Sequence, residues 1–346
     1  MTLASVFIDQ IAMKYIAPNW LPGGNLQTIW PAMISARSLD HPPALPYQRV
    51  RWTTPDNDFI DVDYSIPHTK AMPTPKQPLL VLFHGLEGSS NSHYALAFAK
   101  VAQRRGWAYA VPHFRGCSGE INRAPRAYHS GDFEEIGWML AKLKAAHVLA
   151  GGGAILAVGI SLGGNALMRW AQEEGESALQ TVTALASVCS PLDLAASGAA
   201  ISKGFNRQVY TRMFLNTMKP KAMAKLAMNP GLFDVKALQM SHDLYAFDNI
   251  FTAPVHGFKN TEDYWLRASA KPHMQRIKLP ALALNTVNDP FIPAWSLPQA
   301  ADVSKHVTLW QTAQGGHVGF PQGKFPGQVM AMPEAVSSWL ANHLPA

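Results

Sequence analysis

The sequence predicts a protein of the α/β class, in which a mostly parallel central sheet is flanked by helices. Short, mostly apolar runs alternate along the chain with stretches of helical periodicity, and the run at 79–83 is apolar at every position. Alternating strands and helices form parallel sheets, and parallel strands are apolar throughout because helices cover both faces. A stretch of helical patterns without a predicted strand, residues 192–272, interrupts the alternation.

Length and composition agree with this class. The chain has 346 residues, of which 48% are hydrophobic and 15% are charged, which suits one large α/β domain with an insertion or two smaller domains. We expect an N-terminal extension that packs on the core (1–46), the first part of the core (47–191), a helical cap or lid (192–272) and the second part of the core (273–346).

Residues 1–66 predict elements that lie outside the repeating pattern. Apolar residues at helical spacing within residues 3–16 indicate a short amphipathic helix that rests on the body of the protein or on a membrane surface. Residues 19–31 are rich in proline, glycine and aromatic side chains and are predicted to form a loop. Alternating residues at 47–53 and 59–66 predict an antiparallel hairpin.

After the hairpin, the pattern predicts strands and helices in turn. We expect strands at 79–83, 108–114, 154–158, 183–188, 281–287 and 307–312, and helices at 94–105, 132–146, 166–171 and 329–343. Ligands of parallel sheets bind at the loops that follow the carboxyl ends of the strands. Candidate functional residues are therefore expected in those loops.

The composition argues against several classes of protein. The formal net charge is only +6 and no run is rich in lysine and arginine, so we expect no nucleic-acid partner. No stretch approaches about 18 consecutive apolar residues, so no transmembrane helix is expected. The two cysteines, Cys117 and Cys189, do not form a disulfide framework. Together with an N-terminus that lacks the layout of a signal peptide, these features predict a cytoplasmic location.

Cofactor sites are not predicted either. None of the spacings among the 13 histidines, such as His84 and His93 or His113 and His129, matches a pattern of metal ligands. The first core strand is not followed by the glycine pattern of a dinucleotide site, and no phosphate-binding loop occurs. We therefore expect a protein without a metal or another cofactor.

The most informative motif is Gly159-Ile160-Ser161-Leu162-Gly163. It stands between the strand predicted at 154–158 and the helix predicted at 166–171, which is the setting of a nucleophile elbow. The turn of an elbow is so tight that small residues must stand two positions before and two after the serine, whose oxygen is then exposed above the sheet. Ser161 is therefore the candidate nucleophile. The alternative is an ordinary glycine-rich loop between a strand and a helix.

A nucleophilic serine needs a base that accepts its proton and an acid that orients this base. Around an elbow these residues follow in the order serine, acid, histidine. Asp289 and His317 each come just after one of the last two predicted strands, and they are the candidate acid and base. Asp193, which follows the strand directly after the elbow unit, is the alternative acid.

The negative charge that forms on an attacked carbonyl oxygen needs two backbone N–H donors. One is expected from Leu162, the residue after the nucleophile. The other is expected from the loop after the first core strand, His84-Gly85-Leu86-Glu87-Gly88-Ser89, with Leu86 as the donor. The same loop can also be an ordinary glycine turn, and Glu87 receives no role.

The predicted cap combines basic and apolar residues. Between residues 194 and 233 there are six basic side chains and no acidic one, interleaved with methionine and aromatic residues. One interpretation is an apolar acyl pocket with a basic rim, suited to a lipid or another anionic ester, since methionine-rich faces adapt to flexible apolar partners. The other is a set of helices with apolar faces inward and solvated basic side chains outward. The basic residues are Lys203, Arg207, Arg212, Lys219, Lys221 and Lys225.

Taken together, these motifs resemble the YheT-like family of the α/β-hydrolase superfamily. The resemblance rests on the elbow, the loop after the first core strand, and four further stretches: Gly24-Asn25-Leu26-Gln27-Thr28, His113-Phe114-Arg115-Gly116-Cys117-Ser118-Gly119, Asn288-Asp289-Pro290 and Gly315-Gly316-His317-Val318-Gly319-Phe320. Residues 248–289 also resemble a family stretch, although Trp265 stands where the family usually has tyrosine. The resemblance implies an α/β-hydrolase fold and a serine hydrolase of carboxylic esters, related to animal lipases and esterases.

We therefore expect a cofactor-free esterase or lipase that acts through Ser161, Asp289 and His317 and an acyl-enzyme intermediate. The expected substrate is a small-molecule or lipid ester, such as a medium-chain acyl ester. One alternative is an acyltransferase with the same three residues, in which an alcohol or thiol replaces water. The other alternative is a non-catalytic α/β protein that binds a ligand.

Overall fold

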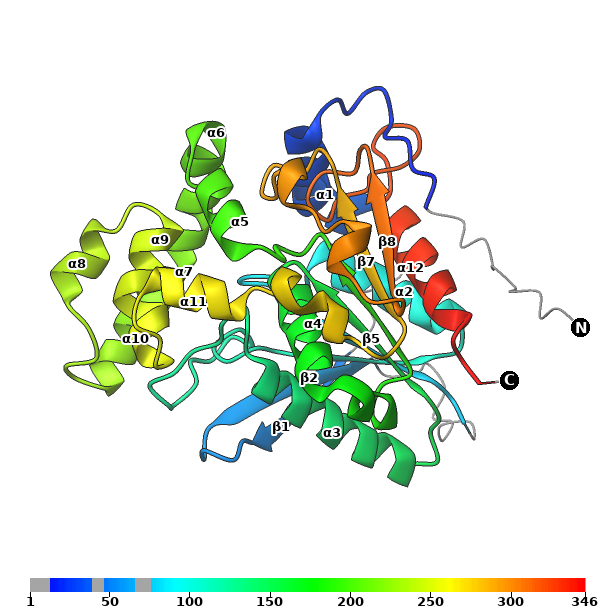
Figure 1. Cartoon of the computed structure of the whole chain (residues 1–346), viewed down its shortest axis with the longest axis horizontal. Coiled ribbons are helices and arrows are strands. Elements are labelled where there is room, and N and C mark those ends of the chain that lie inside the picture. The colour runs from blue at the N-terminus through cyan, green and yellow to red at the C-terminus, as the bar shows by residue number, and fades with distance from the viewer. Residues whose placement is uncertain (1–12, 39–46, 66–75, 346) are drawn as a thin grey trace, which may run out of the picture.

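A central sheet runs through the computed structural model, which describes residues 13–38, 47–65 and 76–345 (Figure 1). Within these residues the sheet has eight strands in the order β1-β2-β4-β3-β5-β6-β7-β8. The pairs β1–β2 and β2–β4 are antiparallel and the other pairs are parallel, which confirms the predicted mostly parallel sheet. The strands are β1 (Tyr47–Thr53), β2 (Phe59–Ser65), β3 (Leu79–Phe83), β4 (Ala108–Pro112), β5 (Ile155–Ile160), β6 (Ala184–Val188), β7 (Ala281–Thr286) and β8 (Val307–Thr312).

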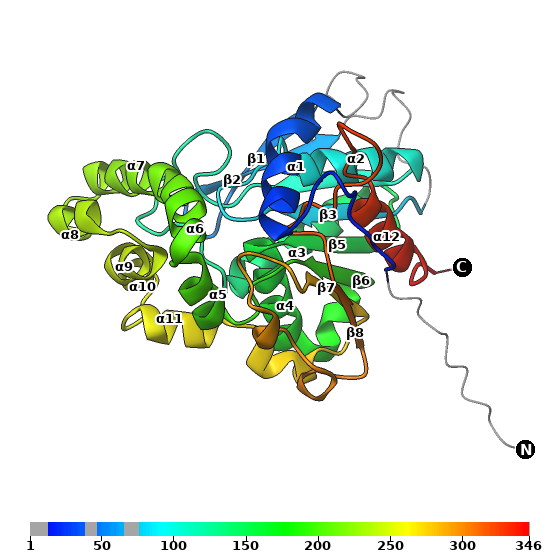
Figure 2. The ribbon, with the colours of Figure 1, turned by 90° about the horizontal axis from the view of Figure 1, so that it is seen from above.

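Helices cover both faces of this sheet. The first, third and fifth residues of β3 pack in one core with α3 and α4, whereas its second and fourth residues pack in another core with α2 and α12. All five side chains are at most 2% exposed, which explains why the strand is apolar at every position. Figure 2 shows α1 lying against α2. The flanking helices are α1 (Gly24–Ser38), α2 (His93–Arg104), α3 (Phe133–Leu149), α4 (Leu162–Glu174) with the 3₁₀ turn Gly175–Gln180, and α12 (Ala331–Ala341).

Between β6 and β7 the chain forms only helices and loops, and no strand occurs among residues 189–280, all of which are described. These inserted helices lie together on one side of the sheet, at the left of Figure 1, and their apolar side chains gather in clusters separate from the two cores of the sheet. They are α5 (Leu194–Ile201), α6 (Gly204–Asn206), α7 (Arg212–Met228), α8 (Val235–Met240), α9 (Leu244–Phe247), α10 (Ala253–Val255) and α11 (Thr261–Ala268), with π-helical turns at Arg207–Thr211 and Asp248–Thr252. Further 3₁₀ turns are Lys271–Arg276, Ala294–Ser296 and Ala300–Asp302. No helix in the described ranges has both the length and the apolar character needed to cross a membrane.

The loop predicted at residues 19–31 is wrong in its second half, because α1 begins at Gly24. Pro31 lies inside this helix and cannot donate a backbone hydrogen bond, which is why the sequence pattern indicates a loop. Tertiary contacts outweigh this loss, since the side chain of Gln27 is fully buried and hydrogen-bonded to three other segments. Most of the helix predicted at residues 3–16 lies outside the described residues, and the part that is described is not helical.

Candidate active site

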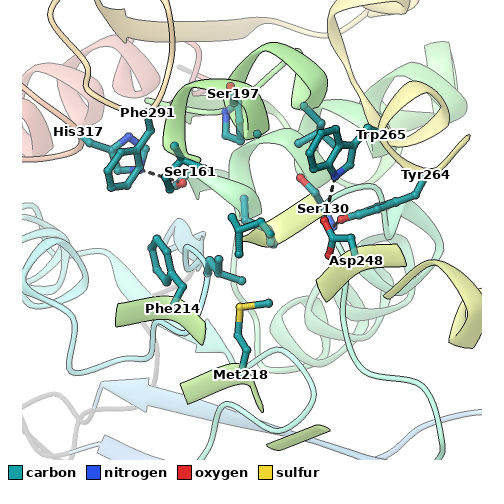
Figure 3. A pocket seen from close by; sticks show the side chains of 17 residues that line it. Ser130, Ser161, Ser197, Phe214, Met218, Asp248, Tyr264, Trp265, Phe291 and His317 are labelled. Carbon is teal, nitrogen blue, oxygen red and sulfur yellow. Dashed lines mark hydrogen bonds between the residues drawn. The ribbon is translucent and has the colours of Figure 1, made fainter. Parts of the chain in front are cut away.

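Ser161 occupies a strained turn between β5 and α4. Its backbone φ is 51° and its ψ is −119°, a combination that residues other than glycine seldom adopt. The backbone N–H of Ser161 donates to the carbonyl oxygen of Val188 on β6 at 2.9 Å, which holds the turn against the neighbouring strand. The serine side chain lines a cavity next to the carboxyl ends of the strands (Figure 3).

The glycines around Ser161 leave no room for a side chain. A Cβ atom at Gly159 would lie 2.4 Å from the Cα atom of Gly164, and one at Gly163 would lie 2.5 Å from the carbonyl oxygen of His84. Non-bonded atoms do not approach so closely. The observed packing of β5, α4 and the loop after β3 is therefore possible only with glycine at these two positions. The small residues of the motif are therefore a steric requirement of this turn.

His317 lies between the two other residues that the sequence singles out. Its Nε2 atom is 3.0 Å from Oγ of Ser161, and its Nδ1 atom is 2.8 Å from Oδ2 of Asp289. The side chain of Asp289 is fully buried, whereas that of His317 is 10% exposed. The other carboxylate oxygen of Asp289 accepts a hydrogen bond from the N–H of Phe291 at 2.7 Å, and the Phe291 ring packs on the imidazole with 4.2 Å between centroids. The fold thus brings together side chains from loops after β5, β7 and β8.

Other polar candidates make structural contacts instead. Asp193 accepts a hydrogen bond from the N–H of Ala196 and begins α5, and it lines a groove that contains neither the candidate serine nor the candidate base. His84 is fully buried, and Nε2 of its ring accepts a hydrogen bond from the N–H of Phe114 at 3.1 Å. Burial lowers the pKa of His84 to about 3, so its imidazole stays neutral and supports the loop after β3.

The loop that carries His317 is held by α1, a contact that sequence reasoning missed. Oγ1 of Thr28 accepts a hydrogen bond from the backbone N–H of His317 at 2.8 Å. Oε1 of Gln27 accepts hydrogen bonds from the N–H of Gly315 and from Nδ2 of Asn288, both at 2.9 Å. The only signal in the sequence is that this segment shares the family resemblance, which does not say what the segment contacts.

Leu86 and Leu162 both border the cavity that contains Ser161. Leu162 is the first residue of α4, and N–H groups in the first turn of a helix have no partner within the helix. The N–H groups on either side of Leu86 donate to tyrosine hydroxyls at 3.0 and 2.9 Å. For the N–H of Leu86 itself, the described residues offer no partner. Both positions are therefore available to donate toward the cavity.

Glu87, to which the sequence assigns no role, fixes the loop after β3. Its φ is 57°, so the chain turns sharply directly after Leu86. One carboxylate oxygen accepts a hydrogen bond from the hydroxyl of Tyr128 at 2.9 Å, and the other pairs with Nζ of Lys221 on α7 at 2.8 Å. This ion pair connects the inserted helices to the loop that carries Leu86.

The cavity beside Ser161 is small and mainly apolar (Figure 3). Its volume is about 120 Å³, which is slightly less than a protein cavity of about 150 Å³ that binds benzene. Loops of the sheet form one part of its wall and the inserted helices the other. The apolar lining consists of Leu86, Leu162, Pro191, Leu194, Gly198, Ile201, Phe214, Met218, Leu244 and Phe291, and the further polar or aromatic lining of Ser130, Ser197, Asp248, Tyr264 and Trp265.

None of the six basic residues of the predicted cap lines this cavity. Lys221 and Lys225 line a second cavity of about 70 Å³, which shares part of its wall with the first. Lys225 donates to the carbonyl oxygens of Asn122 and Ala124 at 2.6 and 2.5 Å, and burial lowers its pKa to about 8. The structure therefore gives no basic rim to the apolar pocket beside Ser161. The solvated basic face of the other interpretation holds for Lys203, Arg207 and Arg212, which are exposed, but not for Lys225, which is buried. In the described part of the chain, no group of three histidine, cysteine or acidic side chains is arranged to hold a metal ion.

The chain is similar to known proteins along most of its length. Residues 78–324 match the family described as alpha/beta hydrolase fold. The chain is 38% identical over 335 residues to the YheT protein of Escherichia coli (strain K12), which is assigned as an esterase, and the match covers 96% of this chain and 94% of YheT. It is 26% identical over 321 residues to the human phospholipase ABHD3, covering 92% of this chain and 76% of the phospholipase.

A solved structure shows the same fold at lower sequence identity. The esterase Pf2001 of Pyrococcus furiosus matches with a TM-score of 0.54 at 14% identity, and the match covers 96% of this chain and 98% of that chain. At this identity the likeness concerns the fold alone.

Proposed function

Because this chain belongs to the α/β-hydrolase fold family and to the YheT-like family within it, and is a carboxylic-ester hydrolase, we propose that it acts through Ser161, His317 and Asp289. The observation that carries this proposal is the continuous chain of contacts from Asp289 to His317 at 2.8 Å and from His317 to Ser161 at 3.0 Å. A serine hydroxyl is a weak nucleophile, and a base at hydrogen-bond distance activates it.

In the proposed reaction, Oγ of Ser161 attacks the carbonyl carbon of the ester while Nε2 of His317 takes the hydroxyl proton. The imidazolium then gives this proton to the leaving alcohol, so the ester bond breaks and an acyl-enzyme remains. Water, deprotonated by the same imidazole, attacks the acyl carbonyl and releases the acid and Ser161. Asp289 holds Nδ1 of His317 protonated and stabilises the imidazolium. Its complete burial supports this role, because a carboxylate interacts more strongly with a nearby cation where water is excluded.

We assign the stabilisation of the negative carbonyl oxygen to the N–H groups of Leu86 and Leu162. Both residues border the cavity beside Ser161, and the first N–H groups of α4 lie at the positive end of the helix dipole. Such donors act mainly on the transition state, in which the oxygen carries its charge.

We further propose that residues 192–272 form a cap over a core made of the described residues of 47–191 and 273–346. Of the extension predicted at 1–46, we propose that the described residues 13–38 pack on that core, and the rest of the extension lies outside the described residues. The support is that the cavity beside Ser161 is walled by α5, α7, α9 and α11 as well as by loops of the sheet. A cavity of about 120 Å³ holds about five non-hydrogen atoms, by comparison with the cavity of about 150 Å³ that binds benzene. Medium-chain or lipid esters therefore require the inserted helices to move apart or the chain to extend beyond this cavity.

The test is labelling with a fluorophosphonate probe, followed by hydrolysis of p-nitrophenyl esters of increasing acyl length. Wild type is expected to be labelled and active, and Ser161→Ala to lose both properties. Ser177→Ala, the same substitution in the turn after α4, is the matched control and should be labelled like wild type. A folded wild type that is neither labelled nor active on any ester would refute the proposed triad. Excess alcohol in the assay separates hydrolysis from acyl transfer by the ratio of the two products.

A further inference from the structure

One carboxylate lines the mainly apolar cavity on the side away from the nucleophile. Asp248 begins the π-helical turn Asp248–Thr252, and Figure 3 shows it across the cavity from Ser161 and His317. It also lines the adjoining cavity of about 70 Å³. A charged side chain at the junction of two small cavities is unusual unless it has a partner there.

Asp248 has neutral partners only. Nε1 of Trp265 donates to its Oδ2 atom at 2.9 Å, and the side chain of Thr252 also forms a hydrogen bond with it. Burial raises the pKa of Asp248 to about 6, and no positively charged side chain within the described residues pairs with it to offset this effect. A carboxylate can accept about four hydrogen bonds, so Asp248 retains acceptor capacity toward the cavity.

A second polar group in the same wall lacks a partner altogether. The side chain of Ser197 on α5 lines the cavity, and the residue is 7% exposed. Its hydroxyl oxygen finds no hydrogen-bond partner among the described residues. Burying an unpaired hydroxyl costs free energy, and a ligand with a polar group in this cavity would recover part of it.

The position of His317 decides which part of an ester faces Asp248. If His317 gives its proton to the leaving alcohol, as the proposed function requires, the alcohol lies on the side of the imidazole. The acyl group then extends away from His317, toward the side of the cavity where Figure 3 shows Asp248.

We propose that this cavity selects acyl groups that carry a hydroxyl, and that Asp248 is the specificity-determining residue that accepts the hydrogen bond from this hydroxyl. The substrates are then esters of short hydroxy acids. This inference rests on the proposed function and deepens it, because it names the substrate class of the same site. A neutral hydroxyl suits the site better than an ammonium group, since the rest of the lining is mainly apolar and contains no second carboxylate, and burying an ammonium in such surroundings carries a large desolvation cost.

The experiment compares esters that differ only in this group. The p-nitrophenyl ester of 3-hydroxybutanoate is compared with that of 3-methylbutanoate, in which a methyl group replaces the hydroxyl, and with that of 3-aminobutanoate. The pair 6-hydroxyhexanoate and heptanoate repeats the comparison for a hydroxyl farther from the carbonyl. The quantity measured is the ratio of kcat/KM for the hydroxyl ester to that for its methyl counterpart. This ratio does not depend on the fraction of enzyme that is folded.

Wild type is expected to prefer the hydroxyl ester in at least one pair. Asp248→Leu should lower the ratio about tenfold or more, since a hydrogen bond to a charged acceptor is worth about that much in binding. Asp248→Asn keeps an uncharged oxygen acceptor and should give an intermediate ratio. Asp263→Asn, the same substitution outside the cavity on α11, should keep the ratio of wild type.

Several outcomes would overturn this inference. A wild type that hydrolyses both esters of each pair with equal kcat/KM refutes the selection of hydroxyl groups, while the proposed function stands. A preference for the amino ester over the hydroxyl ester refutes the assignment of the substrate class. If Asp248→Leu does not fold, a wild-type ratio near one still decides against the proposal. Absence of both labelling and turnover refutes the proposed function, and this inference with it.

Discussion

The contact between α1 and the loop of His317 can be tested with one substitution. Oγ1 of Thr28 accepts the backbone N–H of His317 at 2.8 Å and donates to the carbonyl oxygen of Gly24 at 2.7 Å. Thr28→Val keeps the shape of the side chain and removes both hydrogen bonds. The N–H of His317 is then left without an acceptor at a helix–loop contact where Thr28 is 8% exposed.

The size of the effect follows from this lost acceptor. A buried donor without a partner costs about 1–3 kcal/mol, and His317 can avoid this cost by moving its N–H toward water. Such a movement displaces the imidazole, whose Nε2 lies 3.0 Å from Oγ of Ser161. If the active arrangement bears the full cost, kcat falls by about 5-fold to 150-fold, because about 1.4 kcal/mol corresponds to a factor of ten. KM should change little, since Thr28 does not line the cavity.

The assay measures kcat and KM with a short p-nitrophenyl ester, together with the rate of fluorophosphonate labelling. Thr28→Ser is the matched control, because it keeps the hydroxyl and loses only a methyl group, and it should retain most of the wild-type kcat. The reasoning is refuted if Thr28→Val folds with unchanged kcat, or if Thr28→Ser loses as much activity as Thr28→Val. A lower thermal midpoint with normal kcat would show that the contact stabilises the fold without positioning the histidine.

Three further predictions concern stability. Gly163→Ala should lower the free energy of unfolding by about 1–3 kcal/mol or more, because the new Cβ atom would lie 2.6 Å from the carbonyl oxygen of Phe83. The same substitution should slow the labelling of Ser161. A urea midpoint equal to that of wild type would contradict this prediction. Glu87→Gln should lower the free energy of unfolding by roughly 1–2 kcal/mol, because it removes the charge that pairs with Lys221 at 2.8 Å. Urea denaturation of variants at Glu87, at Lys221 and at both residues measures how strongly the two residues are coupled. Burial raises the pKa of Asp248 from 3.8 to about 6, so the folded protein binds the proton of this carboxyl more tightly than the unfolded chain does. The resulting stabilisation of the folded state is fully present below about pH 4 and is lost as the pH rises through about 6. Asp248→Asn should therefore gain stability relative to wild type between about pH 4 and pH 7, by at most about 3 kcal/mol, and a difference that does not vary with pH would be the contrary result.

Local sequence patterns predicted most of the fold. The observed bounds of β3 and β8 agree with the predicted ones, and the run that forms β3 is apolar over its whole length. Parallel strands buried on both faces must be apolar, so this signal is strong in a single sequence. The elbow around Ser161 was also visible, because its glycines are required by contacts with residues close by in the sequence and in the neighbouring strand.

Contacts between distant segments were not visible in this way. Pro31 indicated a loop, yet α1 continues through it because Gln27 and Thr28 are tied to segments nearly 290 residues away. Glu87 carried no signal, because its partner Lys221 belongs to the inserted helices. Asp248 was one residue of a family stretch, and only the cavity shows that it faces the same space as Ser161.

By itself, the sequence determined the α/β class and the strand-to-helix turn at Ser161, and it singled out three polar residues that the structure places after β5, β7 and β8. These depend on hydrophobic periodicity and on glycine at a tight turn, both of which are local properties of the chain. The tertiary structure alone decided how the loop of His317 is supported, how large the cavity is and which side chains line it. These properties arise from packing between segments far apart in the sequence, and no local pattern records which surfaces meet.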